Sequence, residues 1–211
     1  MEPTIYKPSI YKGAGIYKTG AGGGGGGGQV IPGLPSNYTP INAVRISQTN
    51  TSQNLKFDNL NFSSDEVSFY IEVKKNTSES SFFSLFSISG QNIYFSGNSG
   101  LIYVFGNGGR YSNKYITDDY QEFTVKNSNN KWYVNGSNSD MSGTFTITNF
   151  WVVGNYNSYI SYKRIKVFKH ENNVDTVYLD LIPVKDENEI VGLYDLVQSR
   201  FLTSSSCSED S

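Results

Sequence analysis

The residue types that perform catalysis or bind metal ions are scarce in this sequence. The 211 residues include one histidine, His170, and one cysteine, Cys207, so we expect no internal disulfide, no Cys–His nucleophile pair and no His/Cys zinc site. A Ser–His–Asp triad would have to use His170 as its base. Because His170 comes at the end of a predicted strand, just before Asn172 and Asn173, we interpret it as a hairpin residue rather than a general base.

Acidic residues provide one candidate for a metal ion. Calcium needs six to eight oxygen ligands, and the adjacent Asp118 and Asp119 could offer two of them. Neighbouring carboxylates are more typical of a plain turn. The sequence therefore predicts no cofactor, with calcium at Asp118 and Asp119 as the alternative.

Two loops contain the residue types that contact sugars, because aromatic rings stack on sugar faces while amides and guanidinium groups bind hydroxyls. The first loop spans residues 106–113 and the second spans 154–159. The alternative is that both are ordinary loops whose tyrosines line an oligomer contact. The candidate glycan-binding residues are Asn107, Arg110, Tyr111, Asn155, Tyr156 and Tyr159.

The first 28 residues differ in composition from the rest of the chain. Ile-Tyr-Lys occurs three times, and seven consecutive glycines, Gly22 to Gly28, form a flexible tether in isolation. One interpretation is a disordered low-complexity leader; the other is an anchor that docks on a partner protein and folds on binding. We favour the anchor, because a solvated tail gains nothing from a repeated Ile-Tyr. Its binding residues would be Ile5, Tyr6, Lys7, Ile10, Tyr11, Lys12, Ile16, Tyr17 and Lys18.

Charge and hydropathy exclude several classes of protein. Seventeen Lys and Arg against nineteen Asp and Glu give a net charge of −2, without the basic excess of a nucleic-acid-binding protein. No apolar run reaches the length of a membrane span, and the first residues lack the basic-then-apolar plan of a secretory signal. We therefore expect no nucleic-acid partner and no membrane partner.

The remaining chain has the pattern of an antiparallel β-sandwich. Val67 to Val73 alternates with period two, and Asn135-Gly136 is a strong hairpin signal. Trp132 and Trp151 fall on strands of the core type. The predicted strands are 44–46, 55–57, 67–73, 82–88, 92–95, 101–105, 121–126, 131–134, 144–148, 150–153, 162–169 and 176–181. We divide the chain into an anchor arm (1–28), a linker (29–41), a β domain (42–204) and a C-terminal tail (205–211).

The last part of the domain carries a distinctive phrase, Asp180-Leu181-Ile182-Pro183-Val184 followed by residues 191–201. We expect Pro183 to end a strand, because proline lacks the donor that a ladder needs. Gly192 would permit a tight bend, and Asp195 would bind local backbone in a turn. The apolar residues expected to close one end of the sandwich are Leu193, Tyr194 and Phe201.

These motifs resemble the concanavalin A-like and laminin G-like jelly rolls of bacteriophage structural proteins. The hairpin Lys131-Trp132-Tyr133-Val134-Asn135-Gly136, the strand Tyr162 to Phe168 and the closing phrase carry the resemblance over about residues 42–204. The Ile-Tyr-Lys leader also resembles leaders on virion proteins of crAss-like gut phages. The resemblance implies an all-β jelly roll on the exterior of a phage particle.

Glycosidases with this fold use a carboxylate pair in a glutamate-x-aspartate-x-x-glutamate pattern on one strand, and Glu171, Asp175 and Asp180 do not match it. We therefore expect no enzymatic activity. The hypothesis from sequence is a head fibre or capsid decoration protein, attached to capsid or other virion proteins by its arm. The sandwich would be a displayed dimer or trimer with weak glycan adhesion. The alternative is a tail-associated adhesin that binds host surface polysaccharide.

Overall fold

A computed structural model of the chain describes residues 30–48, 55–57, 60–76, 82–88, 91–96, 101–104, 110–115, 117, 119–128, 130–144, 146–152, 155–156, 159–172 and 174–210. The anchor arm predicted at residues 1–28 lies outside them. The described part consists of strands and turns with a single 3-10 turn, Ser64–Glu66, and no α-helix. No helix in these ranges is long and apolar enough to cross a membrane.

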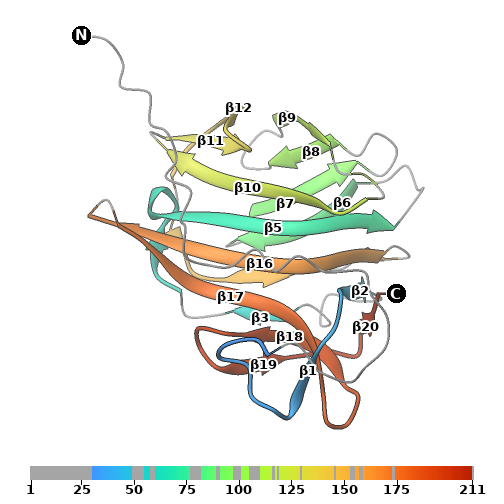
Figure 1. Cartoon of the computed structure of the whole chain (residues 1–211). Coiled ribbons are helices and arrows are strands. Elements are labelled where there is room, and N and C mark those ends of the chain that lie inside the picture. The colour runs from blue at the N-terminus through green and yellow to red at the C-terminus, as the bar shows by residue number, and fades with distance from the viewer. Residues whose placement is uncertain are drawn as a thin grey trace.

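The larger of the two main sheets forms the front layer in Figure 1. Its strands run in the order β12-β11-β10-β5-β16-β17-β18-β19, and β1, β2, β15 and β20 pair along its side. The twelve strands are β1 (Tyr38–Pro40), β2 (Val44–Gln48), β5 (Val67–Asn76), β10 (Gln121–Ser128), β11 (Lys131–Val134), β12 (Ser137–Ser142), β15 (Asn155–Tyr156), β16 (Tyr159–Glu171), β17 (Val174–Asp186), β18 (Val191–Asp195), β19 (Arg200–Leu202) and β20 (Cys207–Glu209).

A six-stranded sheet lies behind it, in the order β3-β14-β6-β7-β8-β9. These strands are β3 (Leu55–Phe57), β6 (Phe82–Ile88), β7 (Gln91–Ser96), β8 (Leu101–Val104), β9 (Arg110–Tyr115) and β14 (Phe150–Val152). A short pair, β4 (Phe62–Ser63) with β13 (Thr146–Ile147), completes the fold. The pairings between the described strands are antiparallel except that of β15 with β2. The predicted antiparallel β-sandwich is confirmed.

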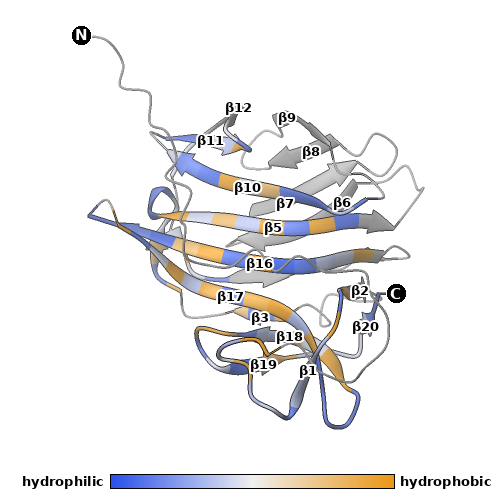
Figure 2. Ribbon diagram, in the orientation of Figure 1, coloured by the Kyte–Doolittle hydropathy of each residue, from blue (hydrophilic) through white to orange (hydrophobic). Residues whose placement is uncertain are grey.

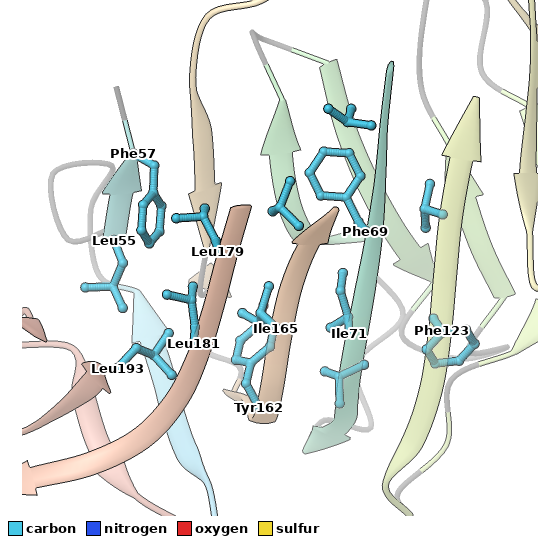
Figure 3. Packing of buried hydrophobic residues seen from close by; sticks show 14 of the residues in the cluster. Leu55, Phe57, Phe69, Ile71, Phe123, Tyr162, Ile165, Leu179, Leu181 and Leu193 are labelled. Atoms are coloured by element: carbon cyan, nitrogen blue, oxygen red, sulfur yellow. The ribbon is translucent and has the colours of Figure 1, made fainter. Parts of the chain in front are cut away.

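The main core lies between the two sheets. One apolar cluster joins Leu55 and Phe57 of β3 to alternate residues of β5, β16 and β17 in the large sheet. Figure 3 shows Leu179 and Leu181 of β17 pointing toward the β3 side chains. Trp132, 1% exposed, belongs to this core, as its strand pattern predicts.

The hairpin signal is also confirmed. Lys131–Val134 forms β11, and β12 begins directly after Asn135-Gly136, with Lys131↔Ser142 and Val134↔Ser137 in register. Asn135 and Gly136 both have positive φ values, 49° and 76°, as a tight hairpin turn requires.

A second, smaller apolar cluster closes the lower end of the large sheet. Ile182, Val184 and Tyr194 are its buried members, and Ile31, Leu34, Tyr38, Leu196 and Phe201 pack against them. The Tyr38 ring lies 4.8 Å from that of Tyr194 and 5.2 Å from that of Phe201. Tyr194 and Phe201 therefore take the closing role predicted for them, whereas Leu193 belongs to the main core.

Two further predictions for the closing phrase are wrong. Pro183 does not end a strand but lies inside β17, opposite Leu193 of β18. On its other side β17 pairs with β16 as far as Leu181 and with β1 from Val184 onward. Pro183 therefore falls in the gap between these two ladders, where no hydrogen-bond donor is needed.

Gly192 is likewise not at a bend. It lies in β18, where a Cβ atom would come within 2.3 Å of the Leu202 carbonyl oxygen and 2.7 Å of the Phe201 ring. The glycine is required by close packing of β19. Asp195 does accept a hydrogen bond from the Val197 amide at 3.0 Å, as predicted for a turn residue.

Paired strands extend beyond residues 42–204 on both sides. β1 comes from the segment predicted as a linker and pairs with β17, and β20 comes from the predicted tail and pairs with β2. The sheet therefore includes residues from Tyr38 to Glu209.

Candidate functional site

The large sheet has one apolar face and one polar face. On β5 the residues Phe69 and Ile71 are buried in the core, while the alternate residues Ser68, Tyr70 and Glu72 are half-buried on the opposite side. The same alternation continues on the neighbouring strands, and Figure 2 shows it as alternating orange and blue bands along β5, β10 and β16. We call the side away from the core the polar face. Its central members are Tyr70, Glu72, Glu122, Thr124, Arg164, Lys166 and Asp180.

Strand register explains why these residues are neighbours. Tyr70 of β5 lies opposite Thr124 of β10 and Lys166 of β16, and Lys166 in turn lies opposite Asp180 of β17. Side chains directly opposite each other on one face have Cβ atoms about 4.5–5.5 Å apart. Four strands that are distant in the sequence thus form one contiguous polar surface.

A tyrosine–carboxylate pair lies on one side of this surface. Tyr70 of β5 and Glu122 of β10 lie on adjacent strands, close enough for the Glu122 carboxylate to act on the Tyr70 hydroxyl. Burial, and then the nearby negative charge of Glu122, raise the pKa of Tyr70 well above its ordinary value. The phenol therefore stays protonated at neutral pH.

An arginine–carboxylate pair lies on the other side. The Arg164 guanidinium donates from Nε to Asp180 Oδ1 at 2.8 Å and from Nη2 to Asp180 Oδ2 at 2.7 Å. The hydrogen bonds that Arg164 donates to Asp180 raise the pKa of Arg164 further. Lys166, whose pKa is lowered by burial, has its Nζ 3.7 Å from the same carboxylate. This pair is fixed in place by two parallel hydrogen bonds.

A third charged group lies at the end of the polar face where β2, β5 and β16 meet. Asp210 is 2% exposed and accepts hydrogen bonds from Arg45 Nη2 at 2.6 Å and Tyr120 Oη at 2.8 Å, with Lys74 Nζ at 2.7 Å. Although burial favours the neutral acid, the hydrogen bonds from Lys74, Arg45 and Tyr120 hold the pKa of Asp210 well below its usual range. The carboxylate is fully engaged, and its role is to hold the sheet together.

The opposite end of the polar face carries three residues in a line. His170 Nε2 lies 2.9 Å from Ser68 Oγ, and His170 Nδ1 lies 2.6 Å from Asp175 Oδ1. His170 lies at the end of β16 and opposite Asp175 across the hairpin with β17, as the sequence predicts for a hairpin residue. Its two side-chain partners were not predicted.

The candidate glycan-binding residues fall on two different sheets. Arg110 and Tyr111 begin β9 of the six-stranded sheet, whereas Asn155 and Tyr156 form β15, which pairs with β2 of the large sheet. Tyr159 begins β16 and pairs with Ser47, the residue that also pairs with Asn155. The structure thus brings Asn155, Tyr156 and Tyr159 together around β2 and separates them from Arg110 and Tyr111. Asn107 lies outside the described residues.

Of the predicted metal and anchor residues, only Asp119 lies within the described ranges. Asp118 and the arm residues, from Ile5 to Lys18, lie outside the described ranges. Asp119 is exposed, and its amide donates a hydrogen bond to Thr117 Oγ1 at 3.2 Å. Within the part of the chain that the structure describes, no three His, Cys, Asp or Glu side chains converge on a common point.

Comparison with known proteins shows that the chain is similar in fold to a solved structure. No protein-family model matches the chain, and no curated protein matches it in sequence. Among solved structures, a Bacteroides ovatus protein described as a candidate carbohydrate-binding protein is similar, with a TM-score of 0.51 at 10% sequence identity. The similarity covers 82% of this chain and 60% of that protein, so the chain spans less than two thirds of its length. At this identity the likeness shows the β-sandwich fold.

Proposed function

We propose that the β-sandwich is a carbohydrate-binding domain and that the polar face of the large sheet is its binding surface. One observation carries the proposal: the Tyr70–Glu122 pair and the Arg164–Asp180 pair lie side by side on adjacent strands of a solvent-facing sheet. The description of the similar Bacteroides ovatus protein as a candidate carbohydrate-binding protein supports the same assignment.

The chemistry of these pairs suits sugar hydroxyls. A carboxylate accepts hydrogen bonds through two oxygens, and a guanidinium donates from up to five N–H groups in a fixed plane. The two hydrogen bonds between Arg164 and Asp180 hold these groups in place before a ligand arrives. Arg164, Lys166 and Lys163 lie beside Glu72, Glu122 and Asp180, and this balance of charge favours a neutral polysaccharide over a polyanionic one.

The finer part of the proposal concerns where the domain works. The resemblance of the closing phrase to phage structural proteins, and of the Ile-Tyr-Lys leader to virion leaders, supports a place on the exterior of a phage particle. The arm would attach to capsid or other virion proteins, and a dimer or trimer of the domain would gain avidity for repeated glycans. A tail-associated adhesin is the alternative, and it requires attachment to tails.

Glycan binding is tested on the full chain with an array of purified bacterial surface polysaccharides. We expect binding that weakens at least about tenfold in Tyr70→Phe and in Arg164→Gln, since each removes a charge-assisted or hydroxyl bond of about 1.5 kcal/mol or more. Tyr178→Phe is the matched control, because the Tyr178 ring packs against Phe62. Equal binding by all three variants, or no binding by the wild type, would reject the polar face as the site.

Attachment is tested separately with purified capsids and tails. Replacing Tyr6, Tyr11 and Tyr17 together by serine is expected to abolish capsid binding and leave glycan binding intact. Retention on tails alone would favour the adhesin.

A further inference from the structure

The line of Ser68, His170 and Asp175 is built by the strand ladders and not by loops. Ser68 of β5 lies opposite Phe168 of β16, His170 is the next residue on that side of β16, and Asp175 of β17 lies opposite His170. All three side chains therefore lie on the polar face, on three adjacent strands. Rigid strands hold such an arrangement more precisely than loops do.

The polarity of the two hydrogen bonds is determined by the carboxylate. An ionised Asp175 can only accept, so in the neutral imidazole the proton is on Nδ1, which donates to Asp175 Oδ1 at 2.6 Å. Nε2 then carries the lone pair and accepts from the Ser68 hydroxyl at 2.9 Å. This is the protonation state in which a histidine removes a proton from a serine.

From this geometry we propose that Ser68 and His170 are the nucleophile and general base of a carboxylic-ester hydrolase site, with Asp175 as the positioning residue. The natural substrate class would be O-acylated sugars bound on the polar face. That choice of substrate rests on the proposed function, whereas the esterase chemistry does not. The sequence argument against an enzyme had two parts. The missing carboxylate pair concerns glycosidic bonds, and ester hydrolysis needs none. The interpretation of His170 as a hairpin residue rather than a base is what this proposal revises, because the hairpin places His170 next to Ser68 and Asp175.

The reactive groups are accessible from solvent. The His170 side chain is 17% exposed and that of Asp175 is 58% exposed, and Ser68 is half-buried. Lys126 of β10, an exposed residue, lies opposite Ser68 on the side away from β16. In the proposed site the Lys126 ammonium group would supply positive charge to stabilise the oxyanion.

The reaction is an ordinary acyl transfer to water. Ser68 Oγ forms a bond to the ester carbonyl carbon while His170 Nε2 takes the hydroxyl proton. The bond to the sugar oxygen breaks, and that oxygen takes the proton from His170 as the deacylated sugar leaves. A water molecule then attacks the acyl-serine, again giving its proton to His170, and the carboxylic acid leaves as Ser68 regains its proton.

The test uses the full chain with two small probes that require no glycan binding. We expect 4-nitrophenyl acetate to be hydrolysed and diethyl 4-nitrophenyl phosphate to label one residue, identified as Ser68 by peptide mass mapping. Ser68→Ala should lower the hydrolysis rate at least about 100-fold and abolish labelling. Ser128→Ala, on β10, is the matched control and should keep both.

Three further outcomes decide the assignment. Asp175→Asn should lower kcat with KM unchanged, which loss of a purely structural link would not do. If Ser68→Ala hydrolyses the ester at the wild-type rate, or the label lies elsewhere, the proposal is overturned and the three residues only tie the hairpin to β5. Labelling at Ser68 without glycan binding would reject the sugar substrate and keep the esterase, so the two proposals fail separately.

Discussion

Arg164 reaches Asp180 diagonally across β16 and β17, although the register places Lys166 directly opposite that carboxylate. The two guanidinium bonds measure 2.8 and 2.7 Å, whereas Lys166 Nζ remains 3.7 Å away. A planar fork can bind both carboxylate oxygens at once, and a single ammonium cannot. The diagonal pair is thus formed because arginine fits the carboxylate better than lysine does.

Arg164→Lys should therefore weaken the domain even though the charge is kept. We expect a loss of about 1–2 kcal/mol in the free energy of unfolding, because one of two charge-assisted bonds disappears from a half-buried site. Urea unfolding measures it. Lys185→Ala, which breaks an exposed ion pair with Glu189, serves as control and should leave the midpoint unchanged. Equal effects of the two substitutions on the free energy of unfolding would contradict a stabilising role for the two-bond contact between Arg164 and Asp180.

Asp210→Asn should make the free energy of unfolding depend less on pH at acidic pH. The folded-state pKa of Asp210 lies below the usual value of 3.8, so the contribution of this carboxylate is complete only at pH values well above 3.8. It is lost as the pH falls through and below it, roughly from pH 5 downward. At pH 7 the variant should be about 1–3 kcal/mol less stable, since the amide leaves Arg45 and Lys74 without their anion.

The difference between wild type and Asp210→Asn should then shrink on acidification, as seen by thermal unfolding at several pH values. Glu209→Gln, the exposed neighbour on β20, is the control and should follow the wild-type curve. A difference that is constant with pH would mean that Asp210 does not titrate as described.

Gly192→Ala should destabilise the domain by about 1–3 kcal/mol, because the added Cβ meets the Leu202 carbonyl oxygen at 2.3 Å. Backbone must move to relieve this contact, so Phe201→Ala in the same chain should not rescue it. Gly136→Asn is the control: it adds a side chain where nothing lies within 4 Å, and asparagine tolerates the positive φ. Chemical unfolding of the three variants distinguishes crowding from a general intolerance of glycine replacement.

Tyr38→Ala should release the segment before β2. The ring packs against Tyr194 and Phe201, and its removal should cost about 2–4 kcal/mol as a large-to-small change in a partly buried cluster. Limited proteolysis should then cut within residues 30–40 faster than in the wild type. Val30→Ala, at a residue 86% exposed, should not alter the cleavage rate.

Local patterns in the sequence predict much of the large sheet. The alternation at Val67 to Val73 and the Asn135-Gly136 turn are local signals, and both appear where expected. The short strands β1, β15 and β20 were missed because two or three residues carry no readable period. Their pairing depends on distant partners in β17 and β2.

The candidate site was harder to predict than the core. The period-two alternation that predicts Phe69 and Ile71 on the core side of the strand also predicts Tyr70 and Glu72 on the opposite side. The polar residues of a single strand could therefore be predicted from the sequence. The neighbours of β5 in the sheet could not be predicted, because the pairing of β5 with both β10 and β16 is non-local. His170 was recognised as the one possible base, but its link to Ser68 spans 102 residues.

The attachment of β1 also has a mechanical consequence. This strand joins the sheet through three residue pairs with β17, followed by a bond from the Ile41 amide to the Pro183 carbonyl. Tension that enters through the residues before Val30 reaches these few bonds ahead of the long ladders of β16 and β17. We therefore expect β1 to detach first under load. The domain would then lengthen by the span of residues 30–40 while its core remains folded.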